Sequence, residues 1–498
     1  MKNQTLSMLL SIILIATVVV AVSATISYSA ELYTLDIALS TAMENSPDIK
    51  QTMLDLERSR ETFKARQAAL KSQFSLTINP FSYSRDRTFN DFFSTWNSSE
   101  KKESGGTFRV NQPLEFTDGT IALINNFSWQ DSYTEYTDRR NKSYNNNLYI
   151  AYEQPLFTYN QIKLDTRELE LNLENTLYTY TIQKMALEQS VTTAFFDVFQ
   201  RKMDLDITID ERVNQQKSYD IIKNKVDAGL SAMEELYQAE LNLASSELAV
   251  QNQQESLDNA LDSFKVMIGI PLSFDIMVDA SVVFEPVDIN LDTALNSGLK
   301  NRLELRQREI NIESALQNLT RTAAQNEFKG SLTLSYGITG ENEQFGDVFE
   351  TPTKKQAVGI SFDIPLWDWG EKKARMKASE LNIDRAHISL EDLRNNIILA
   401  IRRAHRNLLK FNNQIDIAEQ NVRNAGLTYD INLERYRNGD LTSMDLNLYQ
   451  AQLSARKSNL VQTQISYKLA LLNMKILSLW DFEKNVPVLP DNIFDENK

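Results

Sequence analysis

The side chains that most often carry catalysis or metal binding are scarce in this sequence. The chain of 498 residues contains no cysteine and only two histidines, His387 and His405. On one helix these histidines would stand about 27 Å apart, so a single site could not use both. No phosphate-binding loop, nucleophile elbow or metal-ligand spacing occurs. With 67 acidic residues, carboxylate pairs are expected by chance. We therefore predict no enzyme, no catalytic residue, no cofactor and no metal site.

Charge and composition exclude two further classes of protein. The formal net charge of −15 argues against a nucleic-acid partner, because neutralising phosphates needs basic patches. Apolar residues at 42% and charged residues at 24% are incompatible with a disordered chain. The chain has only 14 glycines and 10 prolines, so turns must be few. We expect long elements instead of several globular domains.

The first thirty residues are typical of a secretory signal peptide. Lys2 precedes an apolar run over residues 6–22, and small residues follow it. This pattern predicts cleavage after Ala24 or Ala30. The alternative is an uncleaved membrane anchor, because the apolar run is nearly long enough to span a bilayer.

An internal duplication organises the rest of the chain. Residues 34–39 recur at 290–295, and residues 150–157 recur at 360–367. The offset falls from 256 to 210 between these two matches, so the first half carries 46 extra residues within 79–149. We predict a first repeat over 31–270, a linker over 271–290, a second repeat over 291–480 and a tail over 481–498.

Each half is expected to run helix, strands, helix, helix. Helical apolar spacing covers 35–73 and 291–329, and Pro47 is expected to break the first of these helices early. Pro155 and Pro365 stand where a strand should end and a helix begin. After Pro155 no glycine or proline occurs until Gly229, which predicts a helix of roughly 105 Å. Returning helices are predicted over 231–268 and about 442–478.

The predicted strands are short and few. Alternation of apolar and polar residues predicts strands over 74–83, 107–116, 121–133, 148–154, 331–338 and 358–364, and the polar stretch 84–106 is interpreted as an exposed loop. Four to six strands cannot close a barrel alone, and an open sheet in a membrane would leave backbone groups unsatisfied. Strands that span a membrane would therefore have to close across several copies of the chain. The alternative is a soluble β-subdomain.

These features together resemble the outer-membrane efflux protein (TolC) family over nearly the whole mature chain. The resemblance is carried by the signal, the duplication and four short motifs. The motifs are Asn45-Ser46-Pro47-Asp48, Asn301-Arg302-Leu303-Glu304, Gln154-Pro155-Leu156-Phe157, and the glycine turns at Gly229 and Gly439. The resemblance implies a mainly α protein whose long antiparallel helices form a periplasmic α-barrel, with strands that close into a shared trimeric β-barrel. The 46 extra residues leave open whether that barrel has the family's usual twelve strands or an additional hairpin.

The resemblance also implies partners, a location and a function. The expected partners are two further copies in a homotrimer, outer-membrane lipid, a periplasmic adaptor (membrane fusion) protein and, through it, an inner-membrane pump. The expected location is the cell outer membrane, with extension into the periplasm. The expected function is a passive exit duct for a tripartite efflux pump or a type I secretion system. The alternative is a periplasmic coiled-coil adaptor or scaffold without a barrel.

The candidate site is the far end of the long helices. Glycine at 229 and 439 permits the left-handed conformation in which a helix ends and reverses, and Glu235 and Asp445 then fall in the first turn of each returning helix. Their carboxylates favour the positive end of the helix dipole; under the resemblance, copies of Asp445 would instead form a ring at a cation-attracting gate. By the same resemblance Tyr436 matches the tip motif. Leu441 and Leu448 depart from that motif, so we expect Arg437 and Asp440 to serve as gate links.

Overall fold

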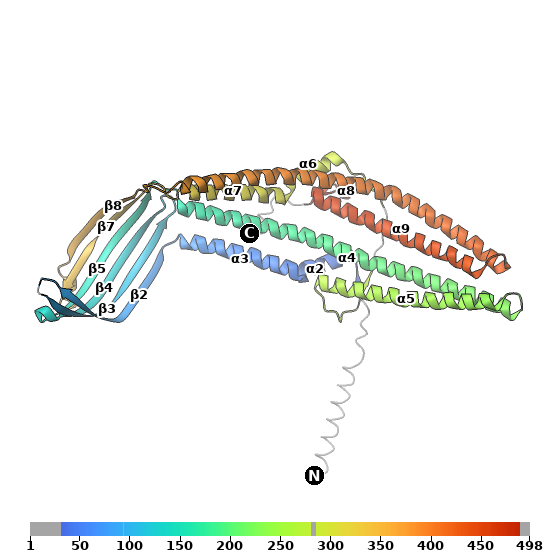
Figure 1. Ribbon diagram of the computed structural model, residues 1–498, viewed down its shortest axis with the longest axis horizontal. Helices are drawn as coiled ribbons and strands as arrows, with labels where there is room; N and C mark the ends of the chain where they lie inside the picture. Colours follow the sequence, from blue (N-terminus) through green and yellow to red (C-terminus); the bar gives the residue numbers. More distant parts are fainter. Residues whose placement is uncertain (1–30, 93, 280–284, 489–498) are drawn as a thin grey trace, which may run out of the picture. The chain divides into compact units, whose positions relative to one another are not determined.

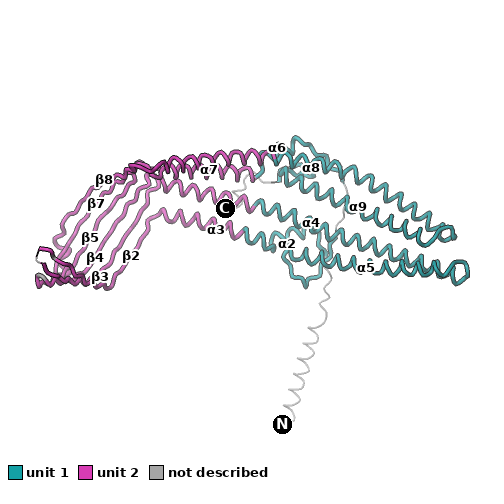
Figure 2. The backbone as a smooth tube through the Cα atoms, viewed as in Figure 1, with its two compact units in different colours: residues 1–52, 181–302, 396–498 teal, residues 53–180, 303–395 magenta. Residues whose placement is uncertain are grey.

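The computed structural model describes residues 31–92, 94–279 and 285–488. The predicted signal peptide and its cleavage site lie outside the described residues. Contacts divide the chain into two compact units (Figure 2). Unit 1 takes residues up to 52, 181–302 and 396 onward, and unit 2 takes residues 53–180 and 303–395. Both longest helices contribute residues to each unit, so the two halves of the sequence are interleaved in the fold.

Long helices dominate the chain, as the scarcity of glycine and proline predicts. Their bounds are α2 (Leu35–Asn45), α3 (Pro47–Ala69), α4 (Gln161–Asp227), α5 (Met233–Ile268), α6 (Leu291–Asn301), α7 (Leu303–Ala323), α8 (Glu371–Asn438) and α9 (Ser443–Ser478). The longest, α4 and α8, have 67 and 68 residues, roughly 100 Å each. In unit 1, α5 returns beside α4 and α9 beside α8 (Figure 1).

A one-residue break separates α2 from α3 and α6 from α7. Ser46 leaves the helical region with ψ 129°, because the ring of Pro47 disfavours a helical residue before it. Arg302 adopts nearly the same conformation, with ψ 121°, although no proline follows. The sequence predicts the first break and misses the second.

Six strands form one antiparallel sheet in unit 2, in the order β2-β3-β4-β5-β7-β8. Their bounds are β2 (Gln73–Asn90), β3 (Thr95–Leu114), β4 (Gly119–Thr134), β5 (Arg139–Leu156), β7 (Lys329–Asn342) and β8 (Thr353–Asp363). The prediction of an exposed loop over 84–106 is wrong. β2 and β3 pair continuously there, from Ser82↔Glu103 to Asn90↔Thr95. Apart from Tyr83, Phe89 and Trp96, the side chains there are polar on both faces, so hydropathy alternation does not reveal the strands.

Two short pairings complete the strand structure. β1 (Glu31–Tyr33) pairs in parallel with β6 (Ile276–Val278), which lies in the segment between the two halves. β9 (Trp480–Asp481) pairs with β10 (Val486–Pro487) after α9. Both pairings belong to unit 1.

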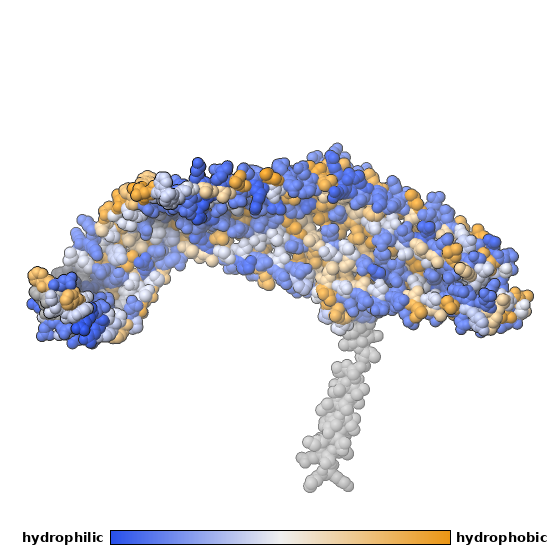
Figure 3. Space-filling view, in the orientation of Figure 1, coloured by the Kyte–Doolittle hydropathy of each residue, from blue (hydrophilic) through white to orange (hydrophobic). Residues whose placement is uncertain are grey.

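Arginine–carboxylate pairs join α4 to α7 along unit 2. Arg306 of α7 donates to Glu174 of α4 at 2.7 Å, and Arg167 of α4 donates to Glu313 of α7 at 2.8 Å. The carboxylate of Glu174 raises the pKa of Arg306 further above its ordinary value. Hydrophilic side chains cover most of the helical surface seen in Figure 3, with hydrophobic ones between them.

Candidate functional site

The two helix reversals at the end of unit 1 follow one plan. α4 ends at Asp227 and α8 at Asn438, and Gly229 and Gly439 follow with φ of +74° and +90°. The N–H of Leu230 reaches back to the carbonyl of Lys225 at 2.8 Å, and that of Asp440 to the carbonyl of Arg435 at 2.9 Å. Such bonds satisfy helix-terminal carbonyls. Both glycines therefore stand where a residue with a side chain would be strained.

Glu235 and Asp445 both lie in the first turn of a returning helix. Asp445 donates its N–H to the hydroxyl oxygen of Thr442 at 3.2 Å, and the Thr442 hydroxyl donates to the Asp445 carboxylate at 2.7 Å. This is a reciprocal cap. Glu235 accepts from the hydroxyl of Ser231 at 3.1 Å. Within one chain each carboxylate thus accepts a hydroxyl hydrogen bond at the start of its helix, which fits the helix-dipole interpretation; Thr442 is a side-chain N-cap, whereas Ala232 at the start of α5 is not.

Tyr436 lies at the centre of the tip and is fully buried. Its hydroxyl donates to the carbonyl of Ser218 at 3.2 Å. The ammonium of Lys225 donates to the carbonyl of Tyr436 at 2.7 Å and lies 5.4 Å from the centre of its ring. Burial raises the pKa of Tyr436 to about 12. These contacts tie α8, from the second half of the sequence, to α4, from the first half.

Apolar and amide side chains extend this contact along the helices. Ile222, Tyr429, Leu446 and Leu453 pack around Tyr436 in one buried cluster. Farther from the turns, Gln215 of α4 donates to Asn447 of α9 at 2.7 Å, and Asn214 donates to Gln450 at 3.2 Å.

Arg437 and Asp440 do not take part in the Tyr436 contact. Arg437 pairs with Glu434 of its own helix at 2.6 Å and its side chain is 51% exposed. The backbone N–H of Asp440 closes the helix end, and its side chain is exposed. Lys225 is not among the residues predicted from the sequence. A signal was present, because the 210-residue offset places Lys225 on Arg435, so a basic residue stands four positions before each glycine.

The two prolines lie near the sheet end of the long helices. Pro155 is the penultimate residue of β5, and Pro365 follows β8. The helices begin later and have polar caps: Asn160 accepts from the N–H of Lys163 at 2.8 Å, and Asp368 accepts from Gly370 at 2.9 Å and Lys372 at 3.0 Å. These N–H groups lower the pKa of Asp368.

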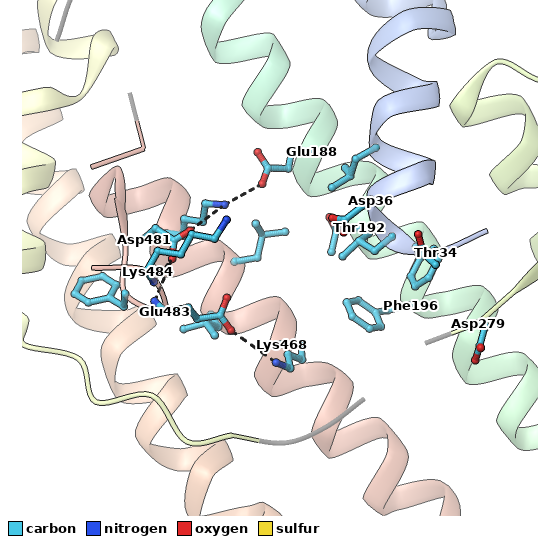
Figure 4. A pocket seen from close by; sticks show the side chains of 17 residues that line it. Thr34, Asp36, Glu188, Thr192, Phe196, Asp279, Lys468, Asp481, Glu483 and Lys484 are labelled. Carbon is cyan, nitrogen blue, oxygen red and sulfur yellow. Dashed lines mark hydrogen bonds and ion pairs between the residues drawn. The ribbon is translucent and has the colours of Figure 1, made fainter. Parts of the chain in front are cut away.

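A cavity of about 480 Å³ lies in unit 1, between α2, α4, α9 and the segment after α9 (Figure 4). Lys475 stands 3.3 Å from Glu188 and 3.5 Å from Asp481, and Lys468 stands 3.7 Å from Glu483. Burial would raise the pKa of Asp481, but backbone N–H groups and Lys475 lower it overall. The charged side chains of the cavity are therefore already ion-paired with one another. The Lys475–Glu188 pair connects the end of α9 to α4.

Neither metal chemistry nor a helical membrane span is found among the described residues. No group of three or more His, Cys, Asp or Glu side chains there could hold a metal ion. Within the same ranges, no helix is both long enough and apolar enough to cross a membrane.

The two faces of the unit 2 sheet differ in polarity. Cross-strand register places Phe74, Val110, Leu123, Ile150 and Tyr336 in one row on one face. The next positions along β4, β5 and β7 on the opposite face are Ile124, Tyr149 and Gly337, and serine, threonine and asparagine dominate that face elsewhere. Side chains on the apolar face are exposed in the single chain, including Phe74 at 70%. Hydrophobic residues also gather where the strands meet the helices (Figure 3).

Long paired helices that carry a sheet with one apolar and one polar face define a channel-forming class of protein. A family model described as "Outer membrane efflux protein" matches residues 294–477. The outer membrane protein TolC of Salmonella enteritidis is 23% identical over 64% of this chain and 68% of its own length. TolC of Escherichia coli K12 is 22% identical over 60% of this chain and 62% of its own length.

Solved structures show the same fold. The Campylobacter jejuni CmeC outer membrane channel aligns with a TM-score of 0.68 at 16% identity, covering 93% of this chain and 89% of that one. The open state of the Neisseria gonorrhoeae MtrE outer membrane channel aligns with a TM-score of 0.65 at 15% identity, covering 89% and 88%. The chain belongs to the outer membrane efflux protein (TolC) family. It is an outer membrane efflux channel and not an enzyme.

Proposed function

We propose that three copies of the chain close their sheets into one barrel in the outer membrane. The observation that carries this proposal is the sheet itself: one face is apolar and exposed, and β2 and β8 are unpaired edges among the described residues. An open edge in lipid would leave backbone groups without partners. Pairing β2 of one copy with β8 of the next satisfies both edges and leaves the polar face toward a water-filled lumen.

The proposed barrel has an additional hairpin per chain and is wider than the family's usual twelve-stranded form. Six strands from each of three copies make eighteen strands. The segments that match between the halves are β2 with β7 and β5 with β8, so β3 and β4 are the inserted hairpin. Barrels of 16–18 strands leave an aqueous channel.

We propose that the helices continue this duct into the periplasm. The two repeats, residues 31–270 and 291–480, each supply a long helix and a stack of shorter ones. The described parts of the linker (271–279 and 285–290) and of the tail (481–488) lie at the equator of these helices, and the signal peptide is removed after Ala24 or Ala30. Pro155 and Pro365 mark the passage from strand to helix.

The tip of the helices is the proposed gate. It contains Gly229, Glu235, Tyr436, Arg437, Gly439, Asp440 and Asp445. The Tyr436–Lys225 contact holds α8 against α4 in the closed state, and opening separates these helices, a change between two packing arrangements. Symmetry gathers copies of Asp445 into an acidic ring that attracts cations, while Arg437 and Asp440 link neighbouring chains.

The duct itself is passive. We propose that a periplasmic adaptor binds at the tip and couples the duct to an inner-membrane pump, which supplies the energy. The resemblance to the family supports this part of the proposal.

Purification and bilayer recording test the proposal. A detergent-solubilised trimer that dissociates on heating and conducts in planar bilayers is expected. Extraction without detergent, or absence of conductance from a folded trimer, would contradict it and would favour the periplasmic scaffold instead.

A further inference from the structure

We propose that the lipid-facing surface of the sheet binds phosphate-bearing lipid headgroups of the outer leaflet, just beyond its apolar band. The inference rests on the proposed barrel, which decides which face meets lipid. The lysines at the centre of this site are Lys102 and Lys142. It will be called the basic patch, and its residues are Arg85, Arg87, Lys102, Arg140 and Lys142.

Strand register places these five cations on one face. Lys102 of β3 lies opposite Asp131 of β4, which lies opposite Lys142 of β5. In the next row, Arg85 lies opposite Glu100, and Arg140 lies opposite Tyr133. Residues alternate between faces along a strand, so the basic patch shares its face with Leu123 and Ile150.

The depth of the basic patch is set by aromatic side chains. Trp129 and Tyr144 lie opposite each other on the same face, two residues before Asp131 and Lys142 along the sheet. Two residues of a strand span roughly 7 Å. Trp and Tyr on a barrel exterior mark the boundary between hydrocarbon and headgroups. The basic patch begins one step beyond that boundary, on the side away from the helices, at headgroup depth.

Part of the positive charge of the basic patch is not neutralised by neighbouring carboxylates. Arg140 pairs with Asp131, Arg85 pairs with Glu100 at 3.5 Å, and Arg87 lies 5.4 Å from the centre of the Trp96 ring. Arg140 donates to the Asp131 carboxylate at 2.7 Å, and Asp131 is only 6% exposed, so this carboxylate already has a partner. Lys102 and Lys142 have no ion pair within the described part of the chain, and their strands are roughly 10 Å apart. Two flexible lysines at that spacing can converge on one phosphate.

The opposite face at the same level carries no such excess. The lipid-facing rows hold five cations and two carboxylates, a net charge of +3, in a chain whose total is −15. Two further carboxylates border these rows: Asp138 accepts from the Tyr133 hydroxyl at 3.1 Å, and Glu135 accepts from the Ser98 N–H at 3.3 Å. The lumenal positions beside them hold Lys101, Arg139, Asp86 and Glu103, which balance. Positive charge beside an apolar, aromatic surface is complementary to a lipid, whose phosphate and acyl chains lie next to each other.

Lipid binding by the full-length trimer tests the inference. The probe is diphosphorylated lipid A in detergent, followed by native mass spectrometry. K102Q/K142Q should weaken binding by roughly tenfold or more, given the contribution of about 1 kcal/mol per basic residue at an anionic surface. K101Q/R139Q removes two cations from the lumenal face and should bind as the wild type does. K102R/K142R keeps the charge and should also bind.

Each alternative outcome has a distinct meaning. Equal binding by the wild type and K102Q/K142Q would overturn the inference, as would equal losses in the lumenal control. Displacement of lipid A by inorganic phosphate at equal concentration would show a free-anion site instead. A trimer that conducts in bilayers while failing to bind lipid A would leave the proposed duct standing and remove only the basic patch.

Discussion

At the tip of the helices, single side chains join α8, from the second repeat, to α4, from the first repeat. Tyr436 is fully buried and contacts α4 through its hydroxyl, its ring and its carbonyl. A hydrogen bond from a charged donor contributes about 1.5–3 kcal/mol. The Lys225–Tyr436 contact alone is therefore large enough to bias a closed tip over an open one.

Removing the Lys225 ammonium should favour the open tip. Lys225→Met keeps the length of the side chain but loses the bond to the Tyr436 carbonyl, so we expect the open probability to rise by about tenfold or more. Single-channel recording in planar bilayers measures it. Lys223→Met, two residues away and exposed, is the matched control. Equal open probabilities for the two variants would show that the contact does not hold the gate.

The buried phenol predicts a loss of stability in alkali. Burial raises the pKa of Tyr436 to about 12, from 10.0 for the free side chain. The neutral phenol therefore stabilises the fold fully below pH 10, and this contribution is lost as the pH rises from 10 toward 12. The thermal unfolding midpoint of the wild type should fall in this range more steeply than that of Tyr436→Phe. Tyr237→Phe, at a 60% exposed position, should follow the wild type, and identical slopes for all three would refute the assignment.

At the scale of elements, glycine placement decides where the long helices reverse. Gly229 and Gly439 adopt positive φ with ample space for a side chain, so only backbone strain opposes substitution. Gly426 lies within α8, also with nothing within 4 Å of an added Cβ, but without positive φ. The same substitution should therefore have opposite effects at these positions.

Alanine at the two kinds of glycine provides the comparison. Gly229→Ala and Gly439→Ala should each destabilise the tip by about 1–2 kcal/mol, while Gly426→Ala should stabilise its helix by about 1 kcal/mol. Hydrogen exchange of amides in the last turns of α4 and α8 measures both effects. Faster exchange in Gly426→Ala would contradict the helical interpretation.

The sequence predicts the long elements well because their signals are local. Glycine and proline are absent from the whole of α4, and α8 contains one glycine, Gly426, and no proline. Such stretches allow little besides a helix. The extension of β2 and β3 was not predictable, because Arg85 and Glu100 carry polar side chains on the face that usually reveals a strand. The repeat offset marks a basic residue at 225, but it could not reveal the partner of Lys225, because that partner is a backbone carbonyl 211 positions away.

At the scale of the whole molecule, the sheet is the part that cannot stand alone. One face of the sheet exposes Phe74, Ile150 and Val358. The two edge strands of the sheet are β2 and β8. Lipid around the apolar face and identical neighbours at the edges satisfy both requirements together. The proposed closed ring uses both edges, because each copy offers one edge of each kind and such contacts close when the rotation between copies permits it.

Cysteine cross-linking between edges tests this closure most directly, and the cysteine-free chain gives it no background. Cysteines at Ser75, Thr77 or Asn79 of β2 would be combined in turn with cysteines at Ala357, Gly359 or Ser361 of β8. In at least one combination we predict oxidation to linked dimers and trimers, with no larger species because the ring is closed. A ladder that continues past the trimer, or monomers alone in all combinations from folded, membrane-extracted protein, would contradict the shared barrel.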